Sequence, residues 1–226
     1  MGSDDLFHKL KKKAKKEQKR EIEKREPYPK FLIVCEDTVS GYHYLKDAVK
    51  HYKLSSANFS IVGLGQDPLR IVEHAEQKYE AENTSYRPDF DQVFCVFDRD
   101  THARYYNAIS KVDTINNKLG TASPVFWAIT SNPCFEVWLI LHFVYTSNAY
   151  AASQNKTAAN KVVSDLLNYL PNYQKSSADT FSETVDKLAV AIDNAERLEK
   201  YCEANFTDVP NTKMYELMRF ISTLKL

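Results

Sequence analysis

Four short apolar runs recur along the first 130 residues of the chain. They are FLIVC at 31–35, FSIVG at 59–63, VFCVF at 93–97 and VFWAI at 125–129, and successive runs begin 28, 34 and 32 positions apart. A strand, helix and strand that form one repeating unit occupy about 30 residues, so this spacing predicts a series of βα units. None of the runs alternates apolar with polar residues, which is typical of strands buried on both faces of a parallel sheet.

The segments between the runs have helical patterns. We expect helices over roughly 40–53, 67–82 and 102–118, with Asp67 as the N-cap of the second and Pro68 as its first residue. The order βαβαβαβ predicts an α/β fold, a four-stranded parallel sheet with helices on both faces. In the common strand order 2-1-3-4, the first and third strands are neighbours. We expect no further strand after the fourth run.

The remainder of the chain is predicted to be helical. The tripeptide Ser131-Asn132-Pro133 is a capping signal before CFEVWLILHF, which we interpret as a buried helix. Further amphipathic helices are expected over 158–170, 181–203 and 212–224. The predicted organisation is a basic helical arm (1–28), an α/β domain (29–145) and a C-terminal helical region (146–226) packed on that domain.

The charge balance excludes a strong overall field. Lys and Arg together number 30, as do Asp and Glu, so the formal net charge is zero. A global field that attracts nucleic acid or membrane is therefore absent, and any binding face must be local. The one candidate is the arm, whose Lys11, Lys12 and Lys13 belong to a dense cluster of basic residues. Such a cluster either binds nucleic-acid phosphates, packs against a partner or is simply a solvated face.

Cysteine usage and hydropathy indicate a cytoplasmic protein. The four cysteines contain no C-x-x-C pair, and two of them lie inside apolar strand-like runs, which is typical of reduced, packed thiols. The N-terminus has no apolar signal-peptide region, and no apolar stretch is long enough to span a membrane. We therefore expect no membrane partner.

Acidic residues follow two of the predicted strands. Glu36 and Asp37 come after FLIVC, and Asp98 and Asp100 flank Arg99 after VFCVF. In an open parallel sheet, ligands bind beyond the carboxyl ends of the strands. If the chain is still extended there, Asp98 and Asp100 point to one side and Arg99 to the other. Clustered carboxylates repel one another unless a cation joins them, and oxygen ligands favour Mg²⁺, with Mn²⁺ as a possible substitute. The alternative is that Asp98 or Asp100 only caps the following helix.

Other residues are candidates of lower specificity. Glu136 lies in the first turn of the buried helix, where it either gains from the helix dipole or faces the acidic site. Gly63 and Gly65 precede a helix N-terminus, which suits phosphate but equally a tight turn. Arg70, Arg99 and His102 are candidate substrate-binding residues, together with Lys11, Lys12 and Lys13. For Arg70 and His102 the alternative is a solvated side chain.

The ordered motifs resemble a known family, the RloB-like branch of the Toprim nucleases. The resemblance rests on FLIVCE (31–36), GLGQDPLRIVEHA (63–75), VFCVFDRD (93–100) and SNPCFEVWLILHF (131–143), with a weaker likeness in NFTDVPNTKMYELM (205–218). It implies a Toprim-like (Rossmannoid) sheet and a magnesium-dependent nuclease of a bacterial phage-defence or restriction-linked locus, often encoded beside an AAA-type ATPase.

The resemblance also implies roles for individual residues. Asp98 and Asp100 match the metal ligands, and Glu36 matches a ligand or the general acid/base of phosphodiester cleavage. One departure is Asp37, where the family usually has a glycine that allows a tight turn near phosphate.

Three functions remain open from the sequence. The first is an endonuclease that acts on DNA or RNA. The second is a phosphatase of the haloacid-dehalogenase type, since VFDRDT is similar to its D-x-D-x-T motif, although Thr101 comes one place early. The third is an inactive Toprim-like module that senses a nucleic acid or nucleotide and controls an ATPase partner, an interpretation favoured by Asp37. The sequence leaves the oligomeric state open, with a homo-oligomer possible.

Overall fold

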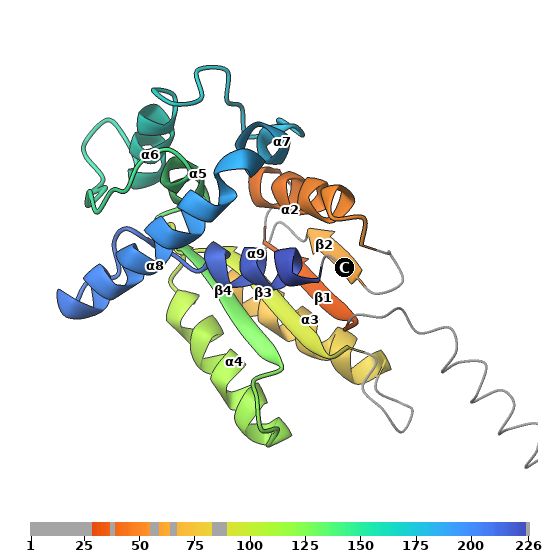
Figure 1. Cartoon of the computed structure of the whole chain (residues 1–226). Coiled ribbons are helices and arrows are strands. Elements are labelled where there is room, and N and C mark those ends of the chain that lie inside the picture. The colour runs from red at the N-terminus through yellow and green to blue at the C-terminus, as the bar shows by residue number, and fades with distance from the viewer. Residues whose placement is uncertain (1–28, 37–38, 55–58, 64–66, 83–89, 225–226) are drawn as a thin grey trace, which may run out of the picture.

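A computed structural model describes residues 29–36, 39–54, 59–63, 67–82 and 90–224 (Figure 1). The predictions for the basic arm, including Lys11, Lys12 and Lys13, and those for Asp37 and Gly65 lie outside these residues.

The chain forms a five-stranded mixed sheet with the order β2-β1-β3-β4-β5. The strands are β1 (Phe31–Cys35), β2 (Phe59–Gly63), β3 (Gln92–Asp98), β4 (Phe126–Asn132) and β5 (Asn211–Thr212). The first four are parallel, as predicted, and their order places β1 beside β3. The prediction of a wholly parallel sheet was wrong, because β5 pairs antiparallel with the end of β4. Only two residues form β5, which is too short to produce a periodic apolar pattern in the sequence.

The three helices that connect the parallel strands are close to their predicted positions. They are α2 (Ser40–His51), α3 (Pro68–Glu82) and α4 (Tyr105–Leu119). The Asp67 carboxylate accepts a hydrogen bond from the Leu69 backbone N–H at 3.2 Å, so it does cap α3. Neither Asp98 nor Asp100 caps α4, because that helix begins only after Arg104.

The chain after β4 is mainly helical, as expected, apart from β5. It contains α5 (Glu136–Leu141), α6 (Ala158–Leu166), α7 (Thr180–Thr184), the 3-10 turn η2 (Val185–Lys187), α8 (Leu188–Ala204) and α9 (Met214–Thr223). All six residues of α5 are buried. The capping role expected of Ser131 and Asn132 was wrong, because β4 continues through both residues and α5 begins after Phe135.

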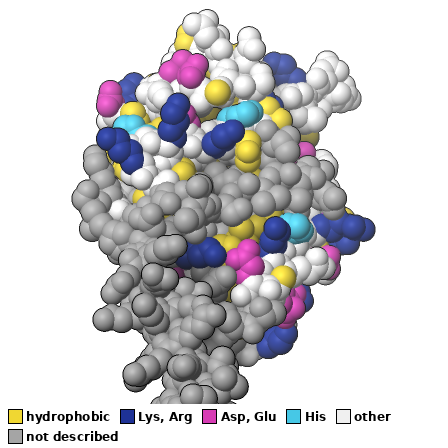
Figure 2. All heavy atoms as spheres, turned by 90° about the vertical axis from the view of Figure 1, so that its right-hand side faces the viewer, with side chains coloured by type: hydrophobic (Ala, Val, Ile, Leu, Met, Phe, Trp, Pro, Cys, Tyr) yellow, Lys and Arg dark blue, Asp and Glu magenta, His cyan; other side chains and the backbone are white. Residues whose placement is uncertain are grey.

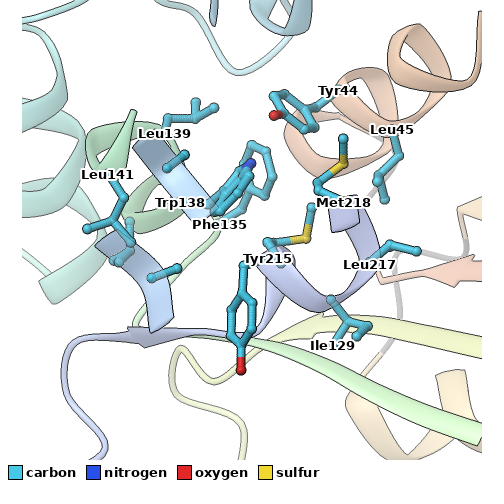
Figure 3. Packing of buried hydrophobic residues seen from close by; sticks show 14 of the residues in the cluster. Tyr44, Leu45, Ile129, Phe135, Trp138, Leu139, Leu141, Tyr215, Leu217 and Met218 are labelled. Carbon is cyan, nitrogen blue, oxygen red and sulfur yellow. The ribbon is translucent and has the colours of Figure 1, made fainter. Parts of the chain in front are cut away.

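Two buried clusters cover the two faces of the sheet. On one face, Leu32 and Val34 of β1 pack with apolar residues of α3 and α4. On the other face, Phe31 and Ile33 pack with residues of α2 and of all the helices from α5 to α9. Figure 3 shows part of the second cluster, in which the rings of Trp138 and Phe135 lie near that of Tyr44 of α2. Burial on both sides explains why the strand sequences are apolar without alternation.

Charged side chains of both signs are interspersed on the part of the surface drawn in colour in Figure 2. Among the residues described, no helix is both long and apolar enough to cross a membrane.

A candidate active site at the carboxyl edge of the sheet

One pocket lies at the carboxyl ends of β1 and β3. Its lining includes Glu36, Asp98, Asp100, His102 and, from the C-terminal region, Lys175. Its volume is about 160 Å³. The pocket therefore gathers three carboxylates, one imidazole and one ammonium where parallel sheets usually bind ligands.

Glu36 is the residue directly after β1, and its carboxylate connects two neighbouring segments. Its backbone N–H donates to the Val96 carbonyl at 2.9 Å, which continues the pairing of β1 with β3. The carboxylate Oε2 accepts from the Asp98 backbone N–H at 3.0 Å. Glu36 Oε1 lies 2.7 Å from His102 Nε2. The Glu36 carboxylate is thus held by the backbone N–H of Asp98 on one side and by the imidazole of His102 on the other.

Asp98 is the last residue of β3, and it contacts the start of α5. Its Oδ2 accepts a hydrogen bond from the Phe135 backbone N–H at 3.0 Å. An N–H at the beginning of a helix has no partner within the helix, so a carboxylate there satisfies the donor and favours the helix dipole. Asp98 therefore supplies the contact that Ser131 and Asn132 were expected to make.

Asp100 lies in a turn rather than on extended chain. Its φ is 34°, its backbone N–H donates to the Pro133 carbonyl at 3.0 Å, and the His102 N–H donates to the Arg99 carbonyl at 3.0 Å. The expectation of an extended chain through Asp100 was therefore wrong. Asp tolerates the left-handed region better than most residues because its short side chain makes local hydrogen bonds. The turn still leaves Asp98 and Asp100 on one pocket, while Arg99 is absent from its lining.

The comparisons with known proteins identify a family. The model of the RloB-like protein family matches residues 31–221, which is most of the chain. The chain belongs to the RloB-like family. Neither the curated proteins nor the solved structures gave a match. The pocket of this RloB-like chain lies wholly within the matched residues.

Two of the predicted substrate-binding arginines of this RloB-like protein do not line the pocket. Arg99 donates to both carboxylate oxygens of Asp208 at 2.7 Å, and Tyr106 donates to the same carboxylate at 2.7 Å. Arg70 is largely exposed and lies 3.8 Å from Asp67. The structure thus places both arginines in ion pairs outside the pocket lining, and Arg99 is paired with the loop before β5.

Glu136 also lies behind the pocket lining rather than in it. Its side chain is 1% exposed, and its Oε1 accepts hydrogen bonds from Tyr173 at 2.8 Å and from Ser40 at 3.3 Å. The same oxygen lies 3.6 Å from Lys175 Nζ. Burial is the largest single effect and lowers the pKa of Lys175, but the surrounding negative groups, Glu136 first and Asp98 among them, together outweigh it and leave the net pKa raised, so the side chain is an ammonium at neutral pH. Glu136 therefore reaches the pocket through Lys175.

Cys134, one of two cysteines in the pocket lining, is not suited to nucleophilic chemistry. Burial raises the pKa of Cys134 well above its ordinary value, and the negative charges of Glu136 and Asp98 raise it further. Because the thiolate is the nucleophilic form, a thiol that stays protonated is inert.

The carboxylate oxygens of the pocket are of the type that binds a hard cation, although they do not form a closed set of ligands around one point. Carboxylate oxygens are the ligands that Mg²⁺ prefers, and three carboxylates line the pocket. Among the described residues, no group of three or more acidic, His or Cys side chains is arranged to hold a metal. Mg²⁺ usually needs only one or two carboxylates and keeps several waters, so the pocket meets that requirement. Asp98 and Asp100, with Glu36 beside them, are the residues that would hold the ion.

Lys175 and Tyr173 were missed from the sequence. They lie in a Ser- and Asn-containing loop between α6 and α7, about 75 residues after the D-x-D segment, and no local motif marks them. A signal existed only indirectly: Glu136 is a charge in an apolar helix, and such a charge requires a partner.

Proposed function

We propose that this RloB-like protein is a Mg²⁺-dependent nuclease with a Toprim-like active site that cleaves phosphodiester bonds of DNA or RNA. The observation that carries the proposal is the convergence of Glu36, Asp98, Asp100 and His102 on one pocket at the carboxyl edge of the sheet. Clustered carboxylates that would otherwise repel one another are an economical way to hold a divalent cation beside a phosphate.

The residues of the pocket have separate tasks in this reaction. Mg²⁺ (or Mn²⁺), when bound, would polarise the phosphate and lower the pKa of an attacking water. During hydrolysis the water oxygen bonds to phosphorus, and the bond from phosphorus to the leaving oxygen breaks. His102 Nε2 lies 2.7 Å from Glu36 Oε1 and donates to it, so the other ring nitrogen would accept the proton of the water or return one to the leaving oxygen. Asp98 and Asp100 would hold the cation and thereby orient the phosphate.

The biological setting proposed is that of the family resemblance. The protein would act in the cytoplasm as a toxic effector of an anti-phage or restriction-linked system, together with an AAA-type ATPase. The basic arm with Lys11, Lys12 and Lys13 would add nucleic-acid affinity through phosphate contacts, which predicts binding that weakens as salt rises.

The test is cleavage of a panel of plasmid, single-stranded DNA and tRNA by the purified protein with Mg²⁺ or Mn²⁺. We expect cleavage that EDTA abolishes and that falls by at least about a hundredfold in Asp100→Asn, since metal positioning contributes several kcal/mol. Asn suits this position because it tolerates the positive φ of residue 100. Asp113→Asn, on the exposed side of α4, is the matched control and should leave the rate unchanged. Equal cleavage by Asp100→Asn, Asp98→Asn and the unaltered protein would remove this pocket as the active site.

A second function has one observation in its favour. Glu36 and Asp98 both accept backbone N–H groups, so the acids also hold β1, β3 and α5 together. The alternative is a module that binds nucleic acid or nucleotide without cleaving it and so controls an ATPase. In such a module Glu36 and Asp98 would need only this structural role. Calorimetry distinguishes the two: the nuclease requires Mg²⁺ binding that Asp100→Asn weakens, whereas the sensing module shows nucleic-acid binding without it.

A further inference from the structure

Lys175 brings a positive charge from the C-terminal region to the acidic pocket. It lies in the loop between α6 and α7, yet it lines the same pocket as Glu36, Asp98 and Asp100. The pocket is therefore assembled from two parts of the chain, with its acids on the sheet and its ammonium on the loop.

A buried carboxylate holds this loop in place. Glu136 Oε1 receives hydrogen bonds from Tyr173, at 2.8 Å, and from Ser40 of α2, at 3.3 Å. A carboxylate that is 1% exposed is stable only when it is paired and hydrogen-bonded, so these contacts are mutually dependent. Together Ser40, Glu136 and Tyr173 connect α2, α5 and the loop immediately before Lys175.

The ammonium of Lys175 still has donors to offer. Its distance to Glu136 Oε1 is 3.6 Å, longer than the 2.7–3.2 Å typical of a hydrogen bond from nitrogen to oxygen. An ammonium has three N–H donors, and the Lys175 side chain is 56% exposed. Glu136 thus attracts the charge without using all of its hydrogen-bonding capacity.

We propose that Lys175 binds a non-bridging phosphate oxygen of the substrate in the acidic pocket, and that Glu136 is a positioning residue that directs Lys175 there. The inference rests on the proposed function, to which it adds a phosphate contact from outside the acidic motifs. Three carboxylates repel a phosphate, and an ammonium that lines the same pocket offsets part of this repulsion in addition to any metal ion.

The first test measures binding of inorganic phosphate by calorimetry in the presence of Mg²⁺. We expect Lys175→Met to weaken phosphate binding by about tenfold to a hundredfold, which corresponds to the loss of one charge-assisted hydrogen bond. Lys175→Arg should recover part of the affinity because it keeps the charge. Lys156→Met is the matched control, since Lys156 is exposed in the same C-terminal region and its side chain donates to Ser164, a residue outside the pocket. Phosphate affinity that is undetectable in the unaltered protein, or that is unchanged in Lys175→Met, overturns the inference.

The second test separates this inference from the proposed function. The same variants are assayed for cleavage of the nucleic-acid panel. If the protein cleaves and Lys175→Met cleaves at the unaltered rate, the inference is wrong and the nuclease proposal stands. If no substrate is cleaved but phosphate binding depends on Lys175, the nuclease proposal fails and the phosphate site remains.

The role of Glu136 is tested by combining variants. Lys175→Met leaves a buried carboxylate without its cation, so this variant loses stability, and Lys175→Met with Glu136→Gln should regain it. If Glu136 acts through Lys175, Glu136→Gln weakens phosphate binding when Lys175 is present. It has no further effect when residue 175 is Met. An equal effect of Glu136→Gln in both backgrounds would assign Glu136 a structural role only.

Discussion

The two faces of the sheet are built from different parts of the chain. The face covered by α3 and α4 uses buried residues between Leu32 and Phe126, which belong to consecutive βα units. The opposite face uses buried residues from Phe31 to Ile221, including every helix of the C-terminal region. The first face is thus a product of local repetition, whereas the second depends on segments far apart in the sequence.

This difference bears directly on the candidate site. The acids follow β1 and β3 and need only the repeated units to come together. Lys175 reaches the pocket because the C-terminal helices pack on the second face. A change that loosens the second face should therefore alter the ammonium side of the pocket before it alters the acidic side.

The largest expected effect is that of Trp138→Ala on the second face. Trp138 is fully buried in α5, and its ring centroid lies 6.5 Å from that of Tyr44 and 4.8 Å from that of His142. Loss of such a side chain should lower the free energy of unfolding by about 4 kcal/mol, measured by urea denaturation. Hydrogen exchange should show lost protection in α2, α5 and α8.

Phe126→Ala is the matched variant on the first face, where Phe126 is also buried. Its cost should be similar, but lost protection should concentrate in α3 and α4. The comparison of the two faces breaks down if both variants lose protection over the same helices.

The next largest effect is a loss of stability at acidic pH that comes from His142 on the second face. Burial, with a smaller contribution from the charge of Lys187, lowers the pKa of His142 to about 4. In the unfolded chain the pKa is about 6.5, so between these values only the unfolded state binds the proton, and stability falls as the pH falls. The loss should be complete near pH 4 and amount to about 3 kcal/mol. The stability is fully present above pH 6.5.

The measurement is the difference between the unaltered protein and His142→Gln in urea denaturation from pH 7 to pH 4. His142 Nε2 lies 3.2 Å from the Tyr44 hydroxyl, and Nδ1 lies 3.0 Å from the Trp138 carbonyl oxygen. The neutral ring satisfies both by accepting from Tyr44 and donating to Trp138. Gln can make both hydrogen bonds without titrating, so the stability of His142→Gln should not show this loss between pH 7 and pH 4. Parallel pH profiles of the two proteins would contradict the assignment of the loss to His142.

A smaller effect is expected from Asn116→Ala on the first face. The Asn116 side chain accepts from the backbone N–H groups of Val125, at 3.0 Å, and Phe126, at 2.9 Å, and donates to the Phe126 carbonyl at 2.8 Å. These bonds tie α4 to the start of β4. Their loss should reduce the free energy of unfolding by about 2 kcal/mol, because the site is partly buried and water replaces some of the contacts. Thr114→Ala, two residues earlier on the exposed side of α4, should cost much less.

The same contrast explains how much was predictable from the sequence. The four parallel strands and the three connecting helices follow from apolar runs at a regular spacing. Their order matches the common 2-1-3-4 arrangement, which brings the acids after β1 and β3 to neighbouring strands. Lys175 and β5 depend on tertiary packing, and neither carries a local pattern. The turn at Asp100 was missed because its backbone bonds to Pro133, which is distant in sequence.

The smallest expected effect on stability comes from Arg99, at the boundary between the two parts. Its pair with Asp208 is partly exposed, with side chains 32% and 46% accessible, so solvent screening limits its contribution to about 1 kcal/mol or less. The pair joins the D-x-D segment to the loop before β5, and Asn132 donates to the Asp208 carbonyl at 2.6 Å from the end of β4. If Arg99 serves only this connection, Arg99→Met should change the rate of cleavage less than about twofold. Asp208→Asn, which removes the same ion pair from the other side, should then behave alike in stability and in rate. A much larger loss of cleavage in Arg99→Met than in Asp208→Asn would instead place the guanidinium on the substrate, as the sequence predicts, and would mean that the ion pair opens when nucleic acid binds.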